Sequence, residues 1–106
     1  MTHDEFKKVV DDQLNYCSKL LTSKGVEYVG DKADRLEAFK LPAGFRKTTP
    51  KEILFGYMLK HLTSLSDMCR EDSKDRDKWV EKITDSINYL LLLRGLVEED
   101  AVNEKN

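Results

Sequence analysis

The residues best suited to chemistry lie in the segment EKITDSINYLLLLRG, which carries Glu81, Asp85 and Asn88. They are separated by steps of four and three residues, so a helix would place all three on one face. A helix that buries this face must pack it against other helices or a second subunit, and the acids would then line a groove. The alternative is that both acids are ordinary solvated residues on a charge-rich helix face.

A second set of polar residues, Lys60, His61 and Asp67, lies earlier in the chain. Lys60 could contact a phosphate group as a compact charge, or it could form an internal ion pair with an acid. His61 lies towards an apolar face. It could be a buried structural histidine, or it could act as a base or a ligand. Asp67 is the acid that would face the acids of the last segment across a groove.

A third source of polar groups is the glycine-rich segment that contains Glu27 and Arg35. We expect these residues to close over the mouth of the groove, Glu27 as a further acid and Arg35 as a phosphate contact. The structural alternative pairs Arg35 with Asp34 in a short helix. The predicted ligand-binding set comprises Glu27, Arg35, Lys60, His61, Asp67, Glu81, Asp85 and Asn88.

Helix-start signals define the elements that would position these groups. Thr2 and Glu5 form a capping box, which predicts a helix that begins near residue 3 and ends at Gly25. Thr49 is followed directly by Pro50, and Glu52 can close a second capping box with Thr49, which predicts the start of a second long helix. Two of the long helices therefore have clear beginnings in the sequence.

A third long helix is predicted from about residue 75 to Arg94, with Gly95 as its stop. The segment between the first two long helices is predicted to be a long loop containing one short helix around Lys32 to Lys40. Residues 100–106 form a polar acidic tail that we expect to fray, which leaves 1–99 as a single helical domain. The predicted fold class is all-α, a small bundle of three long helices with a short helix in the first loop.

Helical spacing also assigns the apolar faces. On the last helix the predicted buried stripe consists of Trp79, Val80, Ile83, Ile87, Leu90 and Leu91, and elsewhere the predicted core includes Phe6, Val10, Leu14, Leu54, Met58 and Leu62. A further apolar group at Tyr89, Leu92 and Leu93 exceeds what one intramolecular face can cover. We therefore expect self-association, most simply as a dimer.

Composition narrows the class of protein. The chain has 106 residues and a formal charge of −2, so it has no global field that would hold it on nucleic acid or an anionic membrane. Its longest apolar run, 89–93, is too short to span a bilayer, and its start lacks a signal peptide's apolar core. We expect a soluble cytoplasmic protein, in which Cys17 and Cys69 are buried free thiols.

The stretches KGVEY, DRLEAFK, KHLTSLSDM and EKITDSINYLLLLRGLVEE resemble a family of small α-helical proteins of tailed phages and prophages, over residues 5–99. More remotely, the acidic last helix resembles the MazG-like all-α nucleoside triphosphate pyrophosphohydrolases and the phage nucleotide-modification-associated proteins. This resemblance implies that Glu81 and Asp85 hold Mg²⁺ against phosphates. The chain departs from that pattern at Lys60 and His61, which stand where those enzymes have Glu-x-x-Glu.

Two hypotheses of different classes follow. In the first, a phage-type protein binds a nucleotide or related phosphate in a groove between helices, as a degenerate pyrophosphohydrolase or as an active one, so catalysis is left open. In the second, a non-enzymatic interaction protein modulates a host protein, such as a defence protein, in the cytoplasm of the host cell. The first requires Lys60, Glu81 and Asp85 to converge, and the second allows them to point apart.

Overall fold

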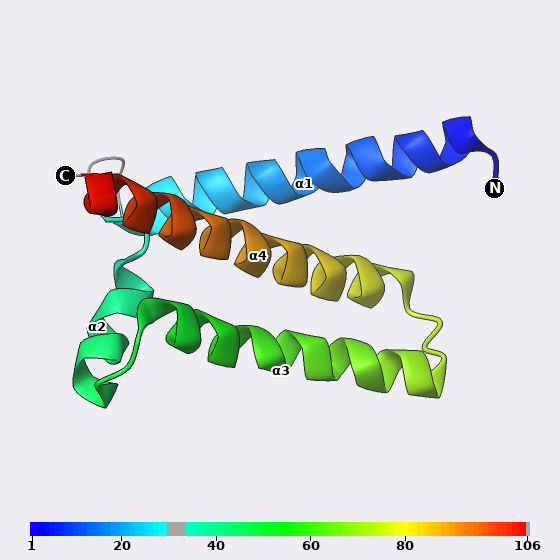
Figure 1. Cartoon of the computed structure of the whole chain (residues 1–106). Helices are drawn as coiled ribbons and strands as arrows, with labels where there is room; N and C mark the ends of the chain where they lie inside the picture. Colours follow the sequence, from blue (N-terminus) through cyan, green and yellow to red (C-terminus); the bar gives the residue numbers. More distant parts are fainter. Residues whose placement is uncertain (30–33, 106) are drawn as a thin grey trace. The chain divides into compact units, whose positions relative to one another are not determined.

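The computed structural model describes residues 1–29 and 34–105, with the side chains of 24–29 and 105 left aside. These residues form four helices, α1 (His3–Val29), α2 (Glu37–Arg46), α3 (Pro50–Glu71) and α4 (Arg76–Lys105), shown in Figure 1. No strand occurs within these ranges, which confirms the all-α fold class. None of the described helices combines the length and the apolar character that a membrane crossing requires.

The chain divides into two compact units, Met1–Ala33 and Asp34–Asn106. The first contains α1. In the second, α3 packs against both α4 and α2. Helices α3 and α4 run antiparallel and are joined by a short connector, as Figure 1 shows. This hairpin brings the middle of α3 opposite the first half of α4.

The start of α1 confirms the predicted capping box. The Thr2 amide donates to Glu5 Oε2 at 2.8 Å, and the Glu5 amide donates to Thr2 Oγ1 at 3.1 Å. The predicted end at Gly25 is wrong, because α1 continues to Val29. Glycine inside a helix costs only about 1 kcal/mol relative to alanine, so it does not by itself end a helix.

Helix α3 begins where the sequence predicts. Thr49 Oγ1 accepts a hydrogen bond from the Glu52 amide at 3.2 Å, so Thr49 is the N-cap. The Glu52 carboxylate accepts from the Thr48 hydroxyl, and not in the reciprocal capping-box arrangement that was expected. The helix ends at Glu71, and the left-handed backbone of its C-cap Asp72 (φ 51°) lets the Asp72 amide donate to a carbonyl of the last turn.

Helix α2 differs in position from the short helix expected around Lys32 to Lys40. It begins at Glu37 and runs through Pro42 to Arg46, while residues 32 and 33 lie outside the described ranges. Proline removes one amide donor from the helix, but Phe39 and Ala43 lie one turn apart and are both buried. The packing of Phe39 and Ala43 therefore outweighs the cost of a proline inside the helix.

Helix α4 runs straight through Gly95 and through the residues expected to fray. Glu99 Oε1 lies 2.6 Å from Lys40 Nζ, and Asp100 Oδ2 lies 2.6 Å from Lys51 Nζ. These ion pairs join the end of α4 to α2 and α3. The acids that suggested a solvated tail therefore form ion pairs with α2 and α3.

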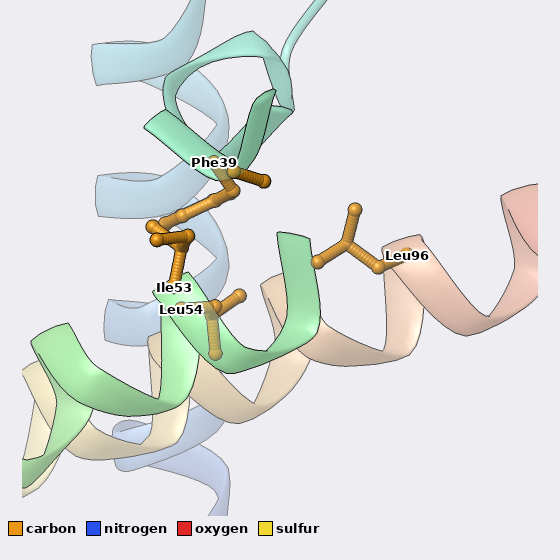
Figure 2. Close-up of a cluster of buried hydrophobic side chains, with 5 residues drawn as sticks. Phe39, Ile53, Leu54 and Leu96 are labelled. Carbon is orange, nitrogen blue, oxygen red and sulfur yellow. The ribbon is translucent and has the colours of Figure 1, made fainter. Parts of the chain in front are cut away.

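The core of the second unit lies where α2, α3 and α4 meet. Figure 2 shows Phe39, Ile53, Leu54 and Leu96 converging there. Leu36, Tyr89, Leu92 and Leu93 pack against this cluster. The residues that predicted a dimer interface, Tyr89, Leu92 and Leu93, thus pack partly buried against this cluster, and self-association stays a prediction.

The apolar faces were assigned only partly correctly. Leu54 and Met58 are buried as predicted, and Trp79, Val80 and Ile87 are half-buried, whereas Phe6, Val10, Leu14, Leu62, Ile83, Leu90 and Leu91 are exposed. The reason for the errors on α4 is that this helix has two apolar stripes. Periodicity finds both stripes, but contact with α3 decides which one is buried.

Both cysteines are free thiols, as predicted. Cys17 is buried, but Cys69 is exposed. The prediction of a buried Cys69 is wrong. Met68 is the buried residue in the last turn of α3, and Cys69, the next residue, lies on a different side of the helix.

Candidate functional site

One pair of predicted site residues is brought together, His61 of α3 and Asp85 of α4. His61 Nδ1 lies 3.6 Å from Asp85 Oδ2, and the two side chains are 16% and 31% exposed. The distance is too long for a good hydrogen bond, but it allows a charge pair whenever the imidazole is protonated. The antiparallel hairpin produces this contact, because it places the middle of α3 opposite the first turns of α4.

Tyr89 extends the pair by one helical turn. Its ring centroid lies 5.2 Å from that of His61, with 38° between the ring planes. Burial raises the pKa of the Tyr89 phenol, and the nearby charge of Asp85 and the neighbouring Tyr57 raise it further.

Two buried polar atoms at this level have no hydrogen-bond partner among the described residues, His61 Nδ1 and Asn88 Oδ1. An unsatisfied buried group of this kind costs about 1–3 kcal/mol. Asn88 lies one turn from Asp85 on α4 and is 8% exposed. We call His61, Asp85, Asn88 and Tyr89 the polar centre.

The remaining predicted residues of α3 and α4 are placed differently. Lys60 and Glu81 are exposed, and within the described ranges neither forms an ion pair. The Asp67 carboxylate accepts a hydrogen bond at 2.8 Å from Arg70 of its own helix. These three residues are therefore not linked to the polar centre by any contact that the described part of the chain provides.

The two residues predicted to close the groove add little to this geometry. Arg35 is exposed in the turn before α2, and the side chain of Glu27 lies outside the described residues. Among the side chains that are described, no group of three or more His, Cys, Asp or Glu could hold a metal ion. The Mg²⁺ site at Glu81 and Asp85 stays a prediction.

Sequence reasoning missed two features of this region. Tyr89 was assigned to an interface, although its position four residues after Asp85 was a signal that both lie on one face. Thr84 is fully buried, and Ser86 is buried with its hydroxyl donating to the Lys82 carbonyl at 2.9 Å. Small polar residues within an apolar run gave no signal in the sequence that they would be enclosed.

No family model, curated protein or solved structure matches this chain. The resemblance to phage proteins and to MazG-like enzymes therefore stays a prediction, and the geometry described above has to carry the functional argument.

Proposed function

We propose that this protein is a non-enzymatic interaction protein that binds another protein through an apolar helix surface. One observation carries the proposal. Phe45 of α2 is 82% exposed, and Leu41, one turn earlier on the same helix face, is also exposed. Single exposed apolar residues are common, but a phenylalanine and a leucine side by side on one helix are typical of a contact surface.

The surface on α2 is rigidly supported. Phe39 and Ala43, on the opposite face of this helix, are buried in the core, and Lys40 is ion-paired with Asp34 and Glu99. The helix is therefore fixed while Leu41 and Phe45 stay open to a partner. Aromatic side chains presented in this way frequently dominate binding energies.

The resemblance to small phage proteins supports a bacterial host protein as the partner. Partner binding also agrees better with the positions of Lys60, Glu81 and Asp85 than phosphate binding does. The first two are exposed and neither pairs with Asp85 in the described structure, whereas a phosphate groove needs all three to converge. Bundle scaffolds that present an exposed helix face require no such convergence.

The experiment is site-specific photocrosslinking in bacterial cells. A photoreactive side chain replaces Phe45 in one strain and the exposed polar Lys78 in a control strain. We expect a defined covalent adduct with one host protein only from position 45. The purified partner should then bind the Phe45→Glu variant at least about tenfold more weakly than the wild type. Equal adducts from both positions, or unchanged affinity of the variant, would refute the proposal.

A second candidate function is binding of a nucleotide or related phosphate at the polar centre. It is favoured by one observation, the unpartnered buried atoms His61 Nδ1 and Asn88 Oδ1 beside the Asp85 carboxylate. A ligand that binds only the folded state raises its stability, so a thermal-shift screen of nucleotides with and without Mg²⁺ tests it directly. A saturable shift that Asp85→Asn abolishes would favour this function over the first.

A further inference from the structure

Helix α3 carries a second apolar surface, which faces away from the core. Phe55, Leu59 and Leu62 are exposed large apolar residues, and Ser66 is exposed one turn further on. We call these four residues the outer stripe. Their steps of four, three and four residues place them along one side of the helix, as in the seam of a coiled coil.

The spacing of the outer stripe reads the same in both directions. A second α3 laid antiparallel on the first would therefore place Phe55 opposite Ser66 of the other copy, and Leu59 opposite its Leu62. The sizes fit this arrangement, because the largest side chain meets the smallest and the two leucines meet at the centre. A parallel copy would place Phe55 on Phe55 and leave a gap at Ser66.

Charge favours the same orientation. Glu52 and Arg70 are 18 residues apart (70 − 52), which is five helical turns, so both lie along one edge of the outer stripe. In the antiparallel register Glu52 of each copy comes beside Arg70 of the other. A parallel pair, related by a two-fold axis along the helices, would put these edges on opposite sides of the outer stripe, so the Glu52–Arg70 pairing would not form. Both residues are exposed, and the contact that Arg70 makes with Asp67 is a surface pair of little energetic weight.

We propose that two copies of this chain form an antiparallel dimer through the outer stripe of α3. The contact is isologous, since each copy contributes the same residues about a two-fold axis that lies between Leu59 and Leu62. The dimer uses a different helix face from the α2 surface that carries the proposed function, so either can fail without the other. It also replaces the interface that the sequence suggested at Tyr89, Leu92 and Leu93.

Sedimentation at micromolar concentrations measures the association, and Leu62→Glu perturbs it. This variant brings two carboxylates together at the centre of the seam, and we expect its dissociation constant to rise by about 100-fold or more. Leu41→Glu is the matched control, because it makes the same substitution at an exposed leucine outside the outer stripe. A monomeric wild type would overturn the proposal, as would dissociation by Leu41→Glu alone.

Cysteine crosslinking measures the orientation. In a chain with Cys17→Ala and Cys69→Ser, one preparation carries Phe55→Cys and another, differently tagged, carries Ser66→Cys. We expect a disulfide-linked dimer only when the two are mixed. In the antiparallel register two copies of position 55 are about 16 Å apart, well beyond the reach of a disulfide. A crosslinked dimer from Phe55→Cys alone would show a parallel pair and refute the model. Circular dichroism of each variant confirms that it is folded.

Discussion

Two leucines of α4 provide the sharpest test of the packing. Leu96 is 3% exposed and belongs to the core cluster, whereas Leu90 is 53% exposed, although the sequence pattern assigned Leu90 to the buried stripe. The same substitution by alanine at each position therefore distinguishes the structure from the pattern. Both residues lie well inside the helix, so intrinsic helix propensity changes equally in the two variants.

The expected magnitudes follow from burial. Leu96→Ala removes a side chain enclosed by Phe39, Ile53 and Leu54, and core substitutions of this type cost about 2–5 kcal/mol through lost transfer free energy and the cavity left behind. Leu90→Ala removes a side chain already half in water. Full burial of a leucine is worth about 1.5–3 kcal/mol, so half of it limits the loss to about 0.8–1.5 kcal/mol, and the better helix propensity of alanine reduces this further.

Urea denaturation followed by circular dichroism gives both free energies of unfolding. We expect Leu96→Ala to be less stable than Leu90→Ala by about 2 kcal/mol, with unchanged denaturant dependence. Measurements at several protein concentrations separate folding from association. If Leu90→Ala were the more damaging of the two, the inner face of α4 would be the one that periodicity suggested, and the assignment of the core would be refuted.

Three further predictions concern the cap, the polar centre and an ion pair. Thr49→Ala should lower the free energy of unfolding by about 1 kcal/mol because α3 loses its N-cap, and an unchanged urea midpoint would contradict the cap. Asp85→Asn should lower the raised pKa of Tyr89, as measured by ultraviolet titration with Tyr89→Phe identifying the signal; no change would mean that the carboxylate is not close. Lys40→Met should destabilise the protein by about 0.5 kcal/mol at neutral pH. The hydrogen bond from Lys40 lowers the pKa of Asp34, so the stabilisation is present above the ordinary aspartate pKa. The difference in stability between variant and wild type should therefore vanish as the pH falls below about 4. A difference that does not depend on pH would exclude the Lys40–Asp34 pair as its cause.

Local signals in the sequence determined the beginnings of the helices. The bonds that start α1 and α3 involve residues within three or four positions of each other, so Thr2, Glu5 and Thr49 could be interpreted without any tertiary information. The all-α class followed from the same signals together with the helical spacing of apolar residues. Stop signals were less reliable, because α1 continues through Gly25 and α4 through Gly95, and a single glycine costs a helix only about 1 kcal/mol.

Only tertiary structure decided which faces are buried. Helix α4 has two stripes that could pack, and its contact with α3 selected the one carrying Asp85, Tyr89 and Leu96. The same contact joined His61 to Asp85, although 24 residues separate them (85 − 61), and left Glu81 in solvent. Periodicity along a helix fixes the angles between its side chains. Which face of the helix is directed to the core depends on the energy of contacts between segments distant in sequence, and no local pattern contains that energy.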